Sequence, residues 1–547
     1  MTEPIIHASG HASGAPDPRL TEVEAQITAG DLGRAVALAE RALADGLAHP
    51  LLLNLRAFKA ESQGRIADSL ADLRSAHALA PDDVPVLNAM GLCQSRLGLH
   101  AEAVETLTRA TALAPDFPQA WNNLGVAQLA HGDLEGARRA FEAAAGLEPG
   151  FAEPRGHLAL MAVRRGDRAA ARTAADAALA IKPRLSEAVR ALAMVDLAEN
   201  HPVEAENRLR GLLADPELGP NGRYLSRGLL GDALDGQGRF PEAFEAYQTA
   251  NLGQRDANAA QFGKSGLVEL IEGLQQAFSV GWPRGVEPKP SADPSPARRH
   301  VFLIGFMRSG TTLLEQVLAS QPDAVSLEEK ETLGSGVTAF MSRPESLTRL
   351  AAADERALSE HRADYWKRVR AYGVDPTDKV FVDKMPFDGL RLPLIHRLFP
   401  EASIVFSLRD PRDVIFSCFR HRFAVTAYTY ELLTLESAVR FYDAYMRSVE
   451  TFSRRLPLNM HRYRHEDLVA DFDGQVKAMC DFLGIAWSEA MRDIGRRSRQ
   501  GLVTSPSAPQ LLNGLSREGL QQWRRYEAQL TPFYHGLEPW VRQFGYE

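Results

Sequence analysis

The chain has 547 residues, 45% of them hydrophobic and 24% charged, a composition typical of ordinary globular proteins. That length exceeds what a single hydrophobic core supports, so we expect two or three domains. A net charge of −8, with no acidic or basic tail, argues against nucleic acid as the main partner.

Targeting and cysteine signals are few. The N-terminus lacks the basic-then-apolar order of a signal peptide, and no apolar run approaches the length of a membrane span. The three cysteines, Cys93, Cys418 and Cys480, are far apart and odd in number, which argues against a disulfide framework and a zinc site. We therefore expect a cytoplasmic protein with no metal.

An internal repeat dominates residues 18–262, after a flexible N-terminus at 1–17. Prolines recur every 34 residues, and so do glycines, a series that Asn200 continues. The prolines are Pro81, Pro115, Pro149 and Pro183, and the glycines are Gly30, Gly64, Gly98, Gly132 and Gly166. Each unit predicts two amphipathic helices, with the glycine ending the first helix in a left-handed conformation and the proline starting the next unit.

These units resemble the tetratricopeptide repeat (TPR), since Trp121-Asn122-Asn123-Leu124-Gly125 is close to that family's opening signature. The resemblance implies six or seven stacked helix pairs with a concave groove for a peptide or protein substrate. Two other roles stay open at this stage: the array could only support the second domain, or it could form a homodimer.

The pattern changes after the array. Residues 263–298 predict a connecting helix and a linker rich in Pro and Ser. From 299 to 547, short apolar runs such as HVFLIGF, KVFVDK and ASIVFSLRD alternate with helical patterns, which predicts an α/β domain with a central parallel sheet. The expected fold is thus an all-helical solenoid followed by an α/β domain.

A phosphate-binding loop is predicted at the first of these strands. Gly305-Phe306-Met307-Arg308-Ser309-Gly310-Thr311-Thr312 lies between a buried strand and a helix, so its backbone N–H groups and the helix N-terminus favour an anion. The spacing is close to that of a P-loop, but Thr311 stands in place of the lysine and the basic residue is Arg308. A nucleoside-triphosphate kinase or hydrolase is therefore the weaker hypothesis.

GFMRSGTTLLEQVLASQPD resembles the first donor-binding segment of sulfotransferases that use 3′-phosphoadenosine 5′-phosphosulfate (PAPS). Within that superfamily the chain is most similar to protein-tyrosine sulfotransferases and their bacterial TPR-fused relatives. The resemblance implies that the loop binds the 5′-phosphosulfate through Arg308, Ser309, Gly310, Thr311 and Thr312.

A second segment, Arg409-Asp410-Pro411-Arg412-Asp413 followed by Ser417, resembles the 3′-phosphate site of the same family. The resemblance implies that Arg409 binds that phosphate through its guanidinium and Ser417 through its hydroxyl. The alternative is a surface charge cluster that caps a helix with Asp410.

Sulfuryl transfer to a hydroxyl needs a base and a cation near the leaving group. The resemblance implies that Glu329, 21 residues after Arg308, is the base and that Lys384 is the cation. Arginine and lysine can supply the charge, so no metal is intrinsically required. The relatives often carry an arginine where this chain has Glu331, which bears on substrate preference.

Two further segments depart from the family pattern. His465 occupies the position of an aromatic residue beside the adenosine, and Gln522 replaces a basic residue. Ser507 and Gln510 fall where the C-terminal loop over the nucleotide is expected, with Ser507 near the transition state.

We therefore expect a PAPS-dependent sulfotransferase that releases adenosine 3′,5′-bisphosphate (PAP), with Arg308, Glu329, Lys384 and Ser507 as its catalytic residues. The acceptor hydroxyl is not readable from the sequence. Because of the substitutions at Glu331, His465 and Gln522, the alternative is a TPR scaffold with an inactive nucleotide-binding domain.

Overall fold

The computed structural model describes residues 17–283, 293–499, 514–517 and 519–546. The chain forms two compact units. Met1–Val163 with Asp167–Leu192 form one unit, and Arg164–Gly166 with Ala193–Glu547 form the other. None of the helices in the described ranges combines the length and the apolar character that crossing a bilayer requires.

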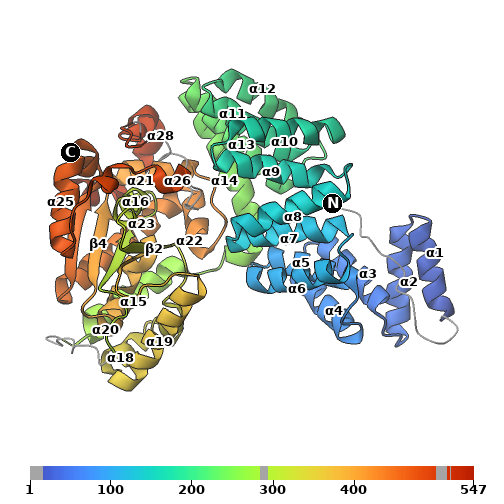
Figure 1. Ribbon diagram of the computed structural model, residues 1–547, viewed down its shortest axis with the longest axis horizontal. Coiled ribbons are helices and arrows are strands. Elements are labelled where there is room, and N and C mark those ends of the chain that lie inside the picture. The colour runs from blue at the N-terminus through green and yellow to red at the C-terminus, as the bar shows by residue number, and fades with distance from the viewer. Residues whose placement is uncertain (1–16, 284–292, 500–513, 518, 547) are drawn as a thin grey trace. The chain divides into compact units, whose positions relative to one another are not determined.

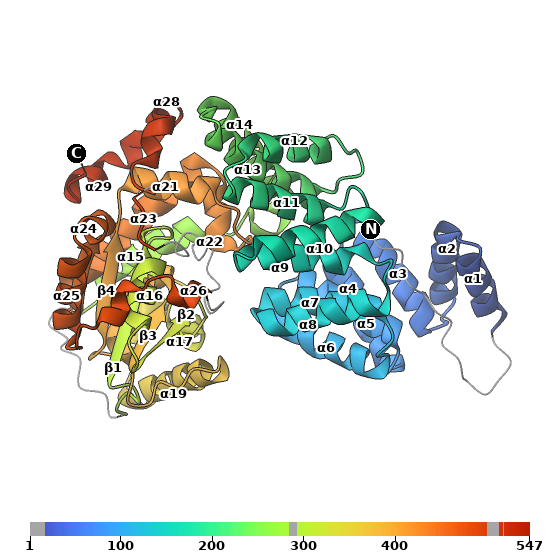
Figure 2. The same ribbon diagram turned by 45° about the horizontal axis from the view of Figure 1, so that its top comes forward.

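The first unit is a stack of paired helices, which lie side by side in Figures 1 and 2. Its helices are α1 (Pro18–Thr28), α2 (Leu32–Ala44), α3 (Pro50–Ser62), α4 (Ile66–Leu79), α5 (Val84–Arg96), α6 (His100–Leu113), α7 (Pro118–His131), α8 (Leu134–Leu147), α9 (Ala152–Arg164), α10 (Arg168–Ile181) and the start of α11 (Ser186–Ala198). Apolar side chains between neighbouring helices form its core.

The turn inside each helix pair has the predicted left-handed residue. The glycines of the series, Gly30, Gly64, Gly98, Gly132 and Gly166, have φ between 75° and 95°, and Asn200, which continues the series, has φ 62°. Asparagine tolerates this conformation better than most residues with a Cβ atom, which explains why it can replace glycine here. The sequence register therefore reflects a backbone requirement.

The prolines of the 34-residue series lie between one helix pair and the next, and not at the first position of a helix. Each is three residues before the next helix: Pro81 precedes α5, which begins at Val84, and Pro115 precedes α7, which begins at Pro118. Pro81 directly follows Ala80, the C-cap of α4. A proline there ends the preceding helix, because it cannot continue the backbone hydrogen bonding.

The second unit begins within the repeat pattern. Its first helices are α12 (Pro202–Leu213), α13 (Pro220–Gly236), α14 (Phe240–Phe262) and α15 (Leu267–Gly281). One continuous apolar core includes residues of these helices, namely Leu230, Leu234 and Tyr247, together with residues that cover the sheet. In addition, the buried Asn251 amide donates a hydrogen bond to the Phe419 carbonyl at 2.7 Å. The sequence predicts a connecting segment at 263–298, whereas the second compact unit takes in the chain from Ala193 onward, because the last helices of the repeat pattern pack into the core that covers the sheet.

A five-stranded parallel sheet forms the centre of this unit, in the order β2-β3-β1-β4-β5. The strands are β1 (Arg299–Gly305), β2 (Ala324–Glu328), β3 (Val380–Lys384), β4 (Ser403–Leu408) and β5 (Asn459–Arg464). In β1, Val301 and Leu303 face one apolar cluster while Phe302 and Ile304 face the other. Helices thus cover both faces, as Figure 1 shows.

The remaining helices connect and cover these strands. They are α16 (Thr311–Ala319), α17 (Gly334–Phe340), α18 (Ser346–Ala352), α19 (Glu355–Ala371), η1 (Pro386–Arg391), α20 (Leu392–Leu398), α21 (Pro411–Arg420), α22 (Ala427–Tyr430), η2 (Glu431–Leu433), α23 (Leu435–Arg455), α24 (His465–Ala470), α25 (Phe472–Leu483), η3 (Glu489–Arg492), α26 (Arg496–Arg499), η4 (Gln522–Tyr526), α28 (Glu527–Leu530), η5 (Thr531–Gly536) and α29 (Glu538–Gln543). The predicted parallel α/β fold is confirmed.

Candidate active site

The carboxyl ends of all five strands carry a predicted site residue. Arg308 follows β1, Glu329 follows β2, Lys384 ends β3, Arg409 follows β4 and His465 follows β5. Parallel strands present these ends at one edge of the sheet. The chain that leaves β1 continues to β2 on one side of it, whereas the chain that leaves the neighbouring β4 continues to β5 on the other side. Ligands of open α/β sheets bind in the crevice at such a switch point.

The predicted phosphate loop has the geometry of an anion site. Gly310 is the N-cap of α16 with φ 100°, and Arg308 has φ 67°, which is uncommon for a residue with a side chain. Ser309, Thr311 and Thr312 are buried at the helix start, where the first N–H groups of a helix have no partner within the helix itself. Burial, with nearby Arg409, lowers the pKa of Arg308 to about 10, which leaves the guanidinium charged at neutral pH.

The two predicted phosphate segments are in direct contact. Arg409 Nη1 donates to the Arg308 carbonyl at 3.0 Å, and Arg308 Nε donates to Ser417 Oγ at 3.0 Å. Ser407 Oγ, at the end of β4, donates to the Ser309 carbonyl at 2.7 Å. Pairing of β1 with β4 explains this contact, since it aligns Gly305 with Ser407.

Glu329 and Lys384 form an ion pair on the other side of β1. Lys384 Nζ lies 2.6 Å from Glu329 Oε1, and the Glu329 backbone N–H donates to the Lys384 carbonyl at 2.8 Å. Register places Glu328 opposite Lys384, so the following residue turns over the end of β3. Glu329 has φ 49°, a strained conformation that proteins retain mainly where the surrounding structure fixes it, often at functional sites.

Lys384 is fully buried. Burial alone would lower the pKa of its ammonium, but the carboxylates of Glu315, Glu329 and Glu328 outweigh burial and raise it. Glu315 Oε2 and Glu328 Oε1 lie 3.5 and 3.6 Å from Nζ. Lys384 therefore keeps its positive charge at neutral pH, which a cation at a leaving group requires.

His465 packs against the phosphate loop. A Cβ atom on Gly310 would lie 2.4 Å from His465 Nδ1, so only glycine fits there. Burial, followed by the charges of Arg409 and Arg308, lowers the pKa of His465 to about 3, so the imidazole is neutral at neutral pH.

The loop region leaves several buried polar atoms unsatisfied. Ser309 Oγ, Arg409 Nε and His465 Nδ1 find no hydrogen-bond partner among the described residues. Buried polar groups are normally satisfied, so orphaned ones at a site call for an explanation. An anion with an adenosine group, carrying phosphate oxygens and ring nitrogens, fits this combination of donors and a neutral imidazole.

The C-terminal segment contacts α21 beside Arg409. Asp413 accepts the backbone N–H groups of Gln521 and Trp523 at 2.6 and 3.0 Å, and Gln522 accepts from Arg420 at 3.2 Å. Arg524 lies against the Trp523 ring. Ser507 and Gln510, which the sequence also predicts as site residues, lie outside the described residues.

The sequence did not single out Glu315 as part of the site. One feature of the sequence could have revealed it: Glu315 stands among apolar residues of the helix TTLLEQVLA. In the structure its carboxyl is buried against the Lys384 ammonium. In the described ranges, no group of three or more His, Cys, Asp or Glu side chains is arranged to hold a metal ion.

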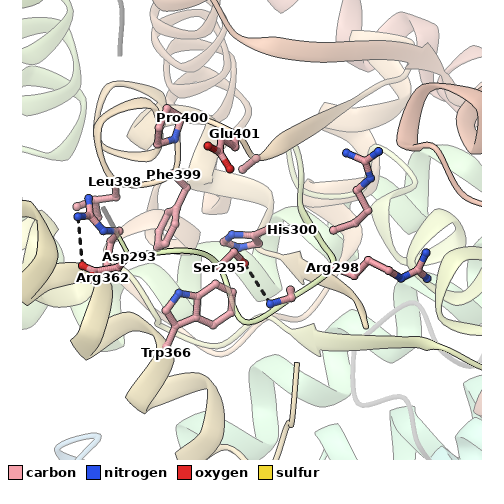
Figure 3. Close-up of a pocket in the computed structure, with 13 residues that line it drawn as sticks. Asp293, Ser295, Arg298, His300, Arg362, Trp366, Leu398, Phe399, Pro400 and Glu401 are labelled. Carbon is pink, nitrogen blue, oxygen red and sulfur yellow. Dashed lines mark hydrogen bonds and ion pairs between the residues drawn. The ribbon is translucent and has the colours of Figure 1, made fainter. Parts of the chain in front are cut away.

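A separate cavity of about 130 Å³ lies at the opposite, amino-terminal ends of strands β1 and β4 (Figure 3). His300, near the start of β1, lines it together with Arg362, Trp366 and Phe399. It contains none of the predicted site residues, and parallel sheets gather their chemistry at the carboxyl edge, so we place the functional site there and not in this cavity.

Comparisons with known proteins find relatives of both parts of the chain. The sulfotransferase family model matches residues 300–489, and a tetratricopeptide repeat model matches residues 89–150. Protein-tyrosine sulfotransferase 1 of Danio rerio is 22% identical over 239 residues, which are 41% of this chain and 65% of that protein. Protein-tyrosine sulfotransferase 2 of Gallus gallus is 24% identical over 41% of this chain and 62% of its own length.

An uncharacterized protein of Aquifex aeolicus is 26% identical over 48% of this chain, and the match spans only 35% of that protein. Among solved structures, a thermophilic TPR protein of Thermus thermophilus is 22% identical, with a TM-score of 0.30, over 33% of this chain and 98% of its own. The family models thus find a sulfotransferase domain within residues 300–489, after tetratricopeptide repeats within residues 89–150.

Proposed function

We propose that this protein transfers a sulfuryl group from PAPS to a hydroxyl, with a tyrosine of a peptide or protein as the acceptor. The proposal rests mainly on two pairs of side chains that lie together at the carboxyl ends of the strands. The Lys384–Glu329 ion pair, at 2.6 Å, and the Arg308–Ser417 hydrogen bond, at 3.0 Å, flank the same strand, β1.

Donor binding follows from the two phosphate segments. The 5′-phosphosulfate would lie at the start of α16, with Arg308 and the buried hydroxyls of Ser309 and Thr312 around it. Arg409 and Ser417 would hold the 3′-phosphate, and the neutral His465 would contact the adenosine. Two separate anion sites distinguish PAPS from a donor with phosphate at one end only.

The side chains then divide the chemistry. Glu329, one-third exposed, can accept the proton of an incoming hydroxyl at Oε1, while Lys384 can balance charge on the leaving oxygen. The donor would supply the sulfuryl group, whose bond to the phosphate oxygen breaks as the bond to the acceptor oxygen forms, leaving PAP. Because Lys384 is buried away from water, its charge would interact more strongly with charge on the leaving oxygen than it would in solvent.

The repeat array supports a peptide or protein acceptor. A cavity of about 200 Å³ in the first unit is lined by Asn54, Asn88 and Asn122, which are 34 residues apart and so occupy equivalent positions in successive repeats. Asparagine amides both donate and accept, which suits the backbone of an extended peptide. We therefore propose that the array recruits the substrate.

Transfer of label from ³⁵S-PAPS to tyrosine-containing peptides tests the function. We expect wild-type protein to label a peptide, and Glu329→Gln to reduce the rate by about 10²- to 10⁴-fold, the usual contribution of a general base. Glu360→Gln, on the exposed surface of α19, is the matched control and should keep the wild-type rate.

The outcomes separate the hypotheses. No transfer to any acceptor, together with no binding of PAP, would refute the proposal. PAP binding without turnover would instead favour the inactive scaffold, for which Glu331 offers a reason: it forms an ion pair with Arg391 at 2.7 Å where relatives often carry an arginine.

A further inference from the structure

The environment of Lys384 contains more negative charge than the proposed reaction uses. Its ammonium lies within 3.6 Å of three carboxylates, those of Glu315, Glu328 and Glu329. The reaction assigns a task only to Glu329. An anionic donor that approaches Lys384 would meet this excess of negative charge, which opposes its binding.

Glu315 differs from the other two carboxylates in its position. It projects from α16, the helix whose start forms the phosphate loop, and its side chain is 1% exposed, against 13% for Glu328 and 33% for Glu329. Glu315 Oε2 accepts no hydrogen bond from the described residues, although it lies 3.5 Å from Nζ. A buried carboxylate with so little hydrogen bonding is held as an anion mainly by the lysine charge.

We propose that Glu315 is a positioning residue, which holds the Lys384 ammonium toward α16 in the resting protein and releases it by taking up one proton from solvent when the anionic donor binds. The inference rests on the proposed function. In this account donor charge replaces the Glu315 charge as the partner of Lys384, so the buried cation stays compensated in both states.

The groups around Glu315 permit this protonation. Lys384 of β3 and Arg497 of α26 favour its charged form, Glu328 of β2 opposes it, and the Ser326 hydroxyl of β2 bonds to its carboxyl. Leu303 of β1 and Met491 of η3, which share an apolar cluster with residues of α16, carry no charge. Burial dominates and raises the pKa of Glu315 to about 7, so a small change in local charge alters its protonation near neutral pH.

Calorimetry of PAP binding across pH, in buffers of different ionisation enthalpy, tests the inference. We expect the wild-type protein to take up a proton on binding and to lose affinity by up to about tenfold per pH unit above pH 7. Glu315→Gln mimics the protonated carboxyl, so its proton uptake should fall and its affinity should exceed that of wild type at pH 8.5 by at least about tenfold. PAP's own ionisation is common to both proteins and cancels in the comparison.

Glu360→Gln should show the wild-type pH dependence. Equal pH dependence in Glu315→Gln and wild type would overturn the role of Glu315, and so would a flat profile in Glu328→Gln but not in Glu315→Gln. If PAP does not bind the wild-type protein at all, the proposed function fails as well, which distinguishes the two failures.

Wild-type protein alone provides a second test, should Glu315→Gln fail to fold. Infrared difference spectra recorded as PAP is added at pH 8 should show the carbonyl stretch of a newly protonated, buried carboxyl. Its absence would overturn the inference.

Discussion

Replacing Gly310 by alanine tests whether the loop at the start of α16 holds the donor. Gly310 has φ 100°, and a Cβ atom there would lie 2.4 Å from Nδ1 of the buried His465. The backbone conformation alone costs about 1–2 kcal/mol for a residue with a Cβ atom. The overlap adds to this cost, because His465 must leave its buried position or the loop must shift.

Gly373→Ala is the matched control. Gly373 has φ 80°, so its backbone strain is similar, but a Cβ atom there meets nothing within 4 Å. We expect Gly373→Ala to lower the free energy of unfolding by about 1–2 kcal/mol without affecting the nucleotide site. The difference between the two variants isolates the effect of the His465 contact.

Chemical denaturation and calorimetry with PAP measure both effects. We expect Gly310→Ala to be less stable than Gly373→Ala and to bind PAP at least about tenfold more weakly than wild type, which corresponds to a loss of about 1.4 kcal/mol. If Gly310→Ala binds PAP within about twofold of Gly373→Ala, the loop is not the donor site and the reasoning fails.

Three further predictions address the second phosphate site, the buried carboxyl and the domain boundary. Arg409→Lys should weaken PAP binding by about tenfold in calorimetry, because lysine lacks the guanidinium fork, whereas Arg447→Lys on the exposed side of α23 should not. The pKa of Glu315 is raised on folding, to about 7, so the stability that it favours is present below about pH 4.5 and is lost as pH rises to 7. We therefore expect the free energy of unfolding of the wild-type protein to fall by roughly 3 kcal/mol more than that of Glu315→Gln between pH 4.5 and pH 7. Equal pH dependence of unfolding in the two proteins would contradict this. A fragment beginning at Ala193 should fold cooperatively in thermal unfolding, whereas one beginning at Arg299 should not, because it lacks Leu234 and Tyr247 of the shared core; cooperative unfolding of the shorter fragment would refute the boundary.

Much of the fold could be predicted because its signals are local. The 34-residue register follows from a left-handed backbone at one position per repeat, which only a few residue types tolerate. Strands β1, β3 and β4 are buried on both faces and therefore have continuous apolar runs in the sequence. Strand β2 was missed, because it is an edge strand in which only Leu327 is buried, so its sequence lacks such a run.

Some residues of the candidate site can be predicted from the sequence, and those whose place depends on the packing of distant elements cannot. The positions of Arg308 and Arg409 follow from strand–helix junctions, which the sequence pattern marks. The burial of Glu315 against Lys384 could not be read from the sequence, because it depends on how α16 packs over β3. For the same reason the change of composition after 262 does not coincide with the start of the second compact unit at Ala193.

The central claim is that the carboxyl ends of the strands form one site for a nucleotide with two separate phosphate groups. Titration of PAP into the wild-type protein, with a chelator present, tests it most directly. We predict one PAP bound per chain, and binding at least about tenfold weaker when Arg409 is changed to alanine. Absence of PAP binding, or binding of magnesium–ATP in its place, would contradict the account.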